Sequence, residues 1–146
     1  FLATKYDYIF IVDADVLPQP HTIERLLTHR RRDELHVAPC LTWNGKGEVC
    51  VMAYYRGNDG LYYPAENASG KTLVVDATGM SGALIPRRVF QAAGKPWFVT
   101  PHDKDGKLET TEDFYFWQNR RKVGWTIMAH CELTADHAKT TWLGQA

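Results

Sequence analysis

The sequence predicts an α/β protein in which helices flank a mixed, mostly parallel sheet. Residues 8–12 form a continuous apolar, β-rich run, which is typical of a strand covered on both faces in a parallel sheet. A helix with one apolar stripe follows at residues 21–31. Residues 125–129 form another buried strand, directly after a helix that Gly124 ends. These three observations indicate one α/β unit, and the chain has no internal repeat or clear linker.

The size and composition of the chain indicate a single domain over residues 1–146. Its 146 residues are 45% apolar and 23% charged, an ordinary balance for a globular protein with a sizeable core. Seventeen basic and seventeen acidic residues cancel, so no overall field favours nucleic acid or an anionic membrane as a partner. No apolar stretch approaches the roughly 20 residues that a transmembrane helix needs.

Cysteine usage and the first residues bear on location. Three cysteines lie far apart and form no CxxC pair, which argues against a disulfide scaffold or a zinc site and favours a reducing compartment. Because residues 1–2 do not resemble a signal peptide, we expect a cytoplasmic protein, with any contact to a membrane surface made through regions outside this chain. The chain starts without Met and is soon in a strand, so we expect it to be cut from a larger protein.

A hairpin and an irregular loop are predicted after the first helix. Residues 36–41 and 49–55 form the two strands of the hairpin, because residues 44–47 carry the turn sequence Asn-Gly-Lys-Gly. Residues 57–70 are rich in Gly, Asn and Tyr and predict an irregular loop.

The following segments alternate short elements with loops. Short strands at residues 73–76 and 83–85 flank a glycine-containing corner at residues 78–82, and a short helix spans residues 86–93. The polar residues 99–109 predict a surface loop that moves.

Asp13 and Asp15 directly follow the first predicted strand. Open α/β sheets place their ligands at the carboxyl ends of their strands. Two carboxylates one residue apart repel each other unless a cation or hydrogen bonds offset the repulsion. A hard divalent ion, Mg²⁺ or Mn²⁺, suits such oxygen ligands and commonly also holds substrate phosphates. The alternative is a pair of aspartates that only form a turn and cap a helix.

Glu112 and Asp113 open a predicted helix over residues 110–123. The helix dipole favours carboxylates at this position, so simple capping is one interpretation. The functional interpretation is an ionised carboxylate that faces a cleft and takes a proton from an attacking hydroxyl.

His137 follows the extended residues 132–136. Imidazole is compatible with Mn²⁺, and this side chain could complete a coordination shell of carboxylates and phosphates. A surface or core histidine is the alternative. The remaining histidines show no partner pattern and are predicted to be structural or exposed; they are His21, His29, His36, His102 and His130.

Three stretches in this order resemble the A-type-fold glycosyltransferases, and family 2 most closely. They are YDYIFIVDADVLPQPHTIERLL, TGMSGALIPRRVF and TEDFYFWQNRRKVGWTIMAHCELTADH, and together they reach from Tyr6 to His137. The resemblance implies a Rossmann-like fold of the nucleotide-diphospho-sugar transferase kind. The usual first strand–helix–strand portion, which holds the base of the nucleotide, has no counterpart before Tyr6.

The resemblance also implies an activity and a donor site. The enzyme would be a hexosyltransferase that moves a sugar from a UDP- or GDP-sugar to a hydroxyl of a carbohydrate, lipid or protein, and would depend on Mn²⁺ or Mg²⁺. Asp15 and His137 would bind the metal, and Asp13 would bind the ribose or the metal through water. Ser81 and Gly82 would line the sugar end of the donor pocket.

On the acceptor side, the resemblance makes Asp113 the general base of an inverting displacement and lets Glu112 orient the acceptor. Trp97 and the loop of residues 99–109 would cover this side and exclude water. Retention of configuration is the alternative stereochemistry, since some A-type enzymes retain it with similar motifs.

Two other functions compete with this interpretation. A haloacid-dehalogenase-type phosphatase also begins with an apolar strand that leads into DxD, and Asp13 would then attack phosphate. That class has its later acidic pair just after a strand, whereas Glu112 and Asp113 open a helix. A non-catalytic fragment that binds a nucleotide-sugar without turnover is the second alternative.

Overall fold

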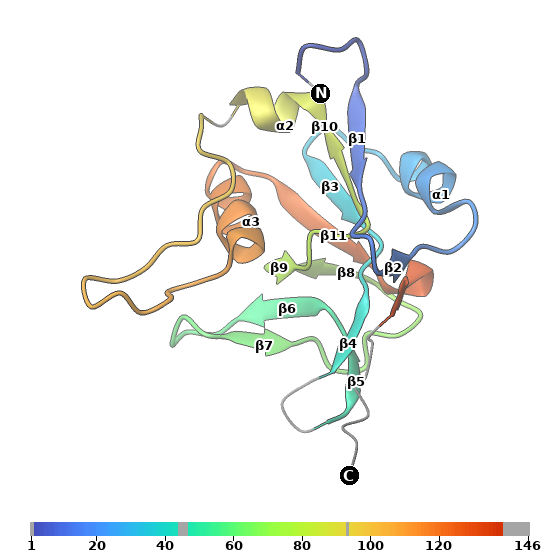
Figure 1. Ribbon diagram of the computed structural model, residues 1–146. Coiled ribbons are helices and arrows are strands. Elements are labelled where there is room, and N and C mark those ends of the chain that lie inside the picture. Colours follow the sequence, from blue (N-terminus) through green and yellow to red (C-terminus); the bar gives the residue numbers. More distant parts are fainter. Residues whose placement is uncertain (1, 44–46, 93, 139–146) are drawn as a thin grey trace.

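A five-stranded sheet forms the centre of the protein. The computed structural model describes residues 2–43, 47–92 and 94–138, and Figure 1 shows the arrangement of its elements. In spatial order, the strands of the central sheet are β1 (Tyr8–Ile11), β10 (Ala83–Pro86), β3 (Glu34–Val37), β11 (Thr126–His130) and β8 (Thr72–Val75).

The directions of these strands contradict the predicted fold class. Only β3 and β11 run parallel, whereas the pairs β1–β10, β10–β3 and β11–β8 are antiparallel. The protein is therefore a strand-rich fold on a mixed sheet, and the expectation of a Rossmann-like, mostly parallel sheet flanked by helices is wrong. The continuous apolar run of β1 did not determine the direction of its neighbour, and β1 itself is half-buried and not covered on both faces as predicted.

Within the described residues, three small antiparallel sheets surround the central one, and a hairpin was the part of them that the sequence predicted. Two of them contain two strands each and the third contains three. They are β2 (Val16–Leu17) with β12 (Asp136–His137), β4 (Leu41–Trp43) with β5 (Val49–Val51), and β7 (Tyr62–Pro64) with β6 (Ala53–Arg56) and β9 (Ala77–Thr78). β4 and β5 form a hairpin in the predicted region, but its strands are residues 41–43 and 49–51 and not 36–41 and 49–55. Residues 36–37 belong to β3 and residues 53–55 to β6. Residues 44–46 of the predicted turn lie outside the described residues. β7 lies within the segment predicted as an irregular loop.

The helices are short. They are α1 (Thr22–Thr28), α2 (Arg87–Ala92), α3 (Glu112–Lys122) and the 3-10 helix η1 (Cys131–Leu133). η1 occupies the start of the segment that was predicted to be extended, and β12 follows it. Within the described ranges, no helix has the length and apolar character that a membrane crossing requires.

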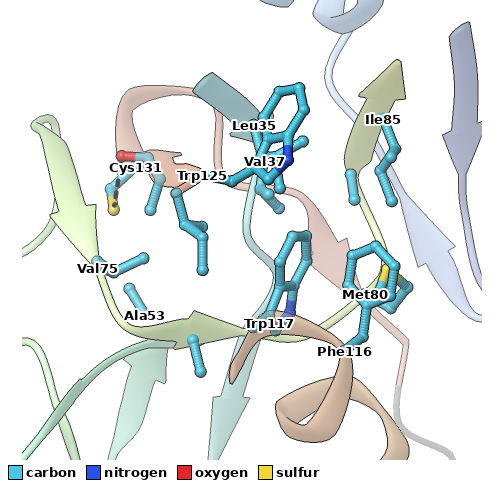
Figure 2. Close-up of a cluster of buried hydrophobic side chains, with 14 of the residues drawn as sticks. Leu35, Val37, Ala53, Val75, Met80, Ile85, Phe116, Trp117, Trp125 and Cys131 are labelled. Atoms are coloured by element: carbon cyan, nitrogen blue, oxygen red, sulfur yellow. Dashed lines mark hydrogen bonds between the residues drawn. The ribbon is translucent and has the colours of Figure 1, made fainter. Parts of the chain in front are cut away.

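The core lies between the central sheet and α3. Phe116 and Trp117 of α3 are fully buried, and Figure 2 shows them beneath Leu35, Val37 and Ile85 of the sheet. The indole N–H of Trp117 donates to the carbonyl oxygen of residue 78 at 2.7 Å, so its polar atom is satisfied inside the core. This contact fixes the first turns of α3 beside the corner that follows β9.

The other face of the sheet carries a smaller cluster. Leu26 of α1 packs there with Leu84 and Leu133, and Phe10 of β1 joins them. Ile9 of β1 contacts the main core instead, so alternate residues of β1 point to opposite faces. β1 is nonetheless only half-buried, because it is the outermost strand of the central sheet as described.

Candidate functional site

The glycine-containing corner before β10 contacts the end of β1. The backbone N–H of Gly82 donates to the carbonyl oxygen of Ile11 at 2.7 Å. The backbone N–H of Asp13 donates to the hydroxyl oxygen of Ser81 at 3.0 Å, and Ser81 is almost completely buried. The structure therefore brings Asp13, Ser81 and Gly82 together, in the neighbourhood predicted for a donor pocket.

Gly82 is the residue on which this contact depends. Its φ of +83° lies in the left-handed region, which favours glycine because other residues bring their Cβ too close to the backbone. Its carbonyl oxygen accepts the N–H of Ala38 at 2.9 Å, and a Cβ at this position would overlap the carbonyl oxygen of Ala38. Gly82 thus joins the end of β1 to the segment after β3.

Asp113 reaches the same corner from the start of α3. Its Oδ2 accepts the backbone N–H of Met80 at 3.1 Å. Burial raises the pKa of the Asp113 carboxyl above its usual value of 3.8, the hydrogen bond from Met80 opposes the rise, and the negative charges of Glu112 and Asp13 add to it. A half-buried carboxyl with a raised pKa accepts a proton more readily than an exposed one. Glu112 is exposed at the same helix start.

Asp15 and His137 meet through the pairing of β2 with β12. The backbone N–H of Ala138 donates to the carbonyl oxygen of Asp15 at 2.8 Å, and Nε2 of His137 lies 3.1 Å from Oδ2 of Asp15. These two residues are 122 positions apart in the sequence, and they were predicted as ligands of one metal.

The hydrogen bond at Nδ1 of His137 determines which ring nitrogen carries a hydrogen. Nδ1 of His137 is 3.1 Å from the carbonyl oxygen of Leu41. A carbonyl only accepts, so Nδ1 carries the hydrogen and Nε2 of the neutral ring directs its lone pair at the carboxylate of Asp15. Two electron-rich atoms at this distance need a proton or a metal ion between them. A backbone carbonyl that fixes the ring of a histidine ligand is also the usual second contact in metal sites.

A buried thiol lies among the carboxylates. Sγ of Cys40 is 3.8 Å from the carbonyl oxygen of Ser81. Burial raises the pKa of Cys40 to about 11, and the negative charges of three aspartates add to the rise although the contact with Ser81 opposes it. The aspartates are Asp13, Asp15 and Asp113. Cys40 therefore stays uncharged, which argues against a nucleophilic role.

A surface hollow of about 290 Å³ adjoins His137. Its wall combines apolar and polar side chains from β4, β5 and β12, namely Leu41, Thr42, Trp43, Val49, Asp136 and His137. Trp43 is 56% exposed, so its ring is accessible for stacking. Neither Trp43 nor the carbonyl of Leu41 was predicted as part of a site, and a backbone carbonyl leaves no signal in a sequence.

Trp97 and the 99–109 loop form a separate feature. The indole N–H of Trp97 donates to the carbonyl oxygen of Phe90 at 3.2 Å, and the two rings meet edge to face. The loop contains a tight turn in which Oδ1 of Asp103 accepts the backbone N–H groups of Asp105 and Lys107, both at 2.9 Å. The contact with Phe90 anchors Trp97 beside α2, and its predicted role on the acceptor side stays a prediction.

Comparisons of the chain with protein-family models, with curated proteins and with solved structures find no match. The chemistry of the site is therefore the basis for assigning a function.

Proposed function

We propose that the chain is the catalytic part of a metal-dependent glycosyltransferase, which moves a sugar from a nucleoside-diphosphate donor to an acceptor hydroxyl. The observation that carries the proposal is the pairing of Asp15 with His137. When Nδ1 donates to the carbonyl of Leu41, Nε2 of a neutral His137 directs its lone pair at a carboxylate oxygen 3.1 Å away. One nitrogen and one oxygen ligand in this arrangement fit Mn²⁺, and also Mg²⁺ with its stronger preference for oxygen.

The chemistry divides between the metal and the side chains. The bound ion supplies positive charge that offsets the charge of the departing diphosphate. Asp113 keeps Oδ2 on the N–H of Met80, so its second oxygen remains to accept the proton of the acceptor hydroxyl. Glu112, exposed one residue earlier, would orient that acceptor. The displacement would invert the configuration of the transferred sugar, because the base and the metal would act on opposite faces of it.

The corner of residues 78–82 links the two halves of this proposed site. It holds Asp13 through Ser81 and Asp113 through Met80. The donor sugar would lie against this corner, between the metal-bound diphosphate and Asp113. The hollow beside His137 offers Trp43 as a stacking surface for another part of a substrate.

Substitution of Asp15 by alanine is expected to abolish nucleotide binding that depends on Mn²⁺. The substitution removes a carboxylate ligand, so the affinity for Mn²⁺ with UDP or GDP should fall by about 100-fold or more. Calorimetric titration of Mn²⁺ into the chain, with and without each nucleotide, measures this effect. The matched control is Asp33→Ala, which removes an exposed carboxylate just before β3 and should bind as the original chain does.

Other results would point to the competing functions. Binding of nucleotide without metal, or equal binding by the Asp15→Ala variant, would contradict the proposal. Release of phosphate from a phosphomonoester that stops in an Asp13→Asn variant would instead indicate a phosphatase. Metal-dependent binding of a nucleotide-sugar without transfer or hydrolysis would indicate a binding module.

A further inference from the structure

We propose that His29, His130 and Glu132 bind a second metal ion, of the zinc class, at the end of β11. One ligand atom from each of the three side chains lies within 4.8 Å of the other two. His130 ends β11, Glu132 belongs to η1, and His29 is the C-terminal cap of α1. His29 is far in the sequence from His130 and Glu132, which are two residues apart, and none of the three is a residue of the proposed transferase site.

The distances suit a small tetrahedral ion. Nδ1 of His130 lies 3.1 Å from Oε1 of Glu132. Two ligands at about 2.1 Å from a tetrahedral zinc ion are about 3.4 Å apart, so little adjustment is needed. The hydroxyl of Thr72 is 3.1 Å from the same carboxylate oxygen and 3.3 Å from Nδ1 of His130, which orients the carboxylate. The ring of His29 lies 4.8 Å from that of His130, centroid to centroid.

A row of polar side chains behind His130 also supports a metal at this position. Nε2 of His130 is 3.0 Å from Nδ1 of His36. The remaining nitrogen of His36, Nε2, is buried without a hydrogen-bond partner among the described residues, and it lies 3.6 Å from Oε2 of Glu34. This row therefore has a carboxylate at each end and two imidazoles between them, in the order Glu34, His36, His130 and Glu132.

Two neutral imidazoles can fill this row in two ways, which differ in whether Nδ1 of His130 carries a hydrogen. If Nδ1 of His130 donates to Glu132, its Nε2 must accept from His36, and Nε2 of His36 then directs a lone pair at Glu34, 3.6 Å away. The opposite arrangement turns the N–H of His36 Nε2 toward Glu34 and leaves Nδ1 of His130 with a lone pair, to which the hydroxyl of Thr72 at 3.3 Å can donate. The second arrangement avoids two lone pairs that face each other at Glu34, and it leaves Nδ1 of His130 available as a ligand.

A metal ion at His130 Nδ1 is compatible with the second arrangement. Nε2 of His130 then carries the hydrogen and donates to His36, and the N–H of His36 Nε2 faces the carboxylate of Glu34. A histidine ligand supported in this way by a further polar chain is the common pattern in zinc sites. Two imidazoles and one carboxylate favour zinc over magnesium or calcium, which prefer oxygen ligands. His29 is exposed, so the ion can reach the site from solvent.

Such an ion would have a structural effect on the candidate active site. Glu132 lies five positions before His137, and α1 follows the segment that carries Asp15. A metal that joins α1 to η1 would thus hold together the two segments that supply Asp15 and His137.

Cobalt titration in an Asp15→Ala background tests the proposal, because that variant lacks the other expected metal site. We expect one Co²⁺ per chain with the intense visible absorption of a tetrahedral ion, and displacement of Co²⁺ by Zn²⁺. His29→Ala should weaken binding by at least about tenfold without unfolding the protein, since this side chain is exposed. His102→Ala is the matched control, because it removes another exposed histidine far from the cluster in sequence.

Glu132→Gln provides a second variant that keeps the size of the side chain. Circular dichroism confirms that each variant is folded. Weaker Co²⁺ binding in folded His29→Ala and Glu132→Gln, with an unchanged control, supports the site. Absorption that is absent, octahedral in type, or unaffected by both substitutions overturns it.

Discussion

Replacement of Asp113 by asparagine is expected to lower the rate of sugar transfer by about 10²–10⁴-fold, the usual contribution of a general base. The amide oxygen of asparagine can still accept the N–H of Met80, which now lies 3.1 Å from Oδ2. The corner should therefore keep its position, and Mn²⁺-dependent nucleotide binding should stay unchanged. Initial rates with saturating donor, measured beside calorimetric binding, separate the two effects.

The same substitution should not destabilise the fold at neutral pH. The pKa of Asp113 is raised above 3.8 in the folded protein, chiefly by burial, so the fold binds a proton at this site more tightly than the unfolded chain does. The stability that this tighter proton binding adds is fully present below the pKa of the aspartate in the unfolded chain. It is lost as the pH rises through the pKa of Asp113 in the folded protein. At pH 7 the ionised carboxylate of Asp113 lowers the free energy of unfolding, because a charge is costly at a half-buried site, and the neutral amide of asparagine carries no such cost. Thermal unfolding should therefore give an equal or higher Tm for Asp113→Asn at pH 7.

The pH dependence of the original chain gives a further check on this assignment. Activity should fall on the acid side with an apparent pKa above 3.8, because protonated Asp113 cannot act as a base. Glu112→Gln is the matched control, since it changes the neighbouring exposed carboxylate; it should raise KM for the acceptor and keep the acid limb. Full activity in Asp113→Asn, or loss of its nucleotide binding, would rule out the role of base.

Much of the local structure could be predicted from the sequence. The strand predicted at residues 8–12 contains β1, and the helix predicted at residues 21–31 contains α1, whose apolar stripe includes the buried Leu26. The helix predicted at residues 110–123 contains α3, which begins at Glu112. The order of the strands and their directions could not be predicted, since they depend on which strands pair across long distances. β10, for instance, lies between β1 and β3 and is antiparallel to both. A pattern of apolar residues carries no information on that choice.

The structure brings together several residues that were predicted to share a site, while their roles stay predictions. Asp15 and His137 are in contact, and Asp13 shares the corner with Asp113. Carboxylate and imidazole side chains can be recognised in a sequence. The backbone groups that orient them, the N–H of Met80 and the carbonyl of Leu41, cannot. His130 was predicted to be structural or exposed, because its partners His29 and His36 lie far away in the sequence and form no recognisable spacing with it.

Replacement of Gly82 by alanine is expected to have the largest effect on stability, and more than about 4 kcal/mol should be lost. Its positive φ alone costs a residue with a Cβ about 1–2 kcal/mol. The new methyl would also overlap the carbonyl oxygen of Ala38, which cannot move away because the N–H of Ala38 is bonded to Gly82 itself. Natural domains have only about 5–15 kcal/mol of stability, so a large fraction of the variant should be unfolded at 25 °C.

Gly106→Ala separates the two causes of that loss. Gly106 also has a positive φ, +77°, but a Cβ there would meet nothing within 4 Å. Urea denaturation followed by circular dichroism should show a loss of about 1–2 kcal/mol for Gly106→Ala and a much larger one for Gly82→Ala. Equal losses would mean that the corner can shift away from Ala38. In that case Ser81 and Met80 would be free to move as well, and the corner could not hold Asp13 and Asp113 in the fixed positions that catalysis by these carboxylates requires.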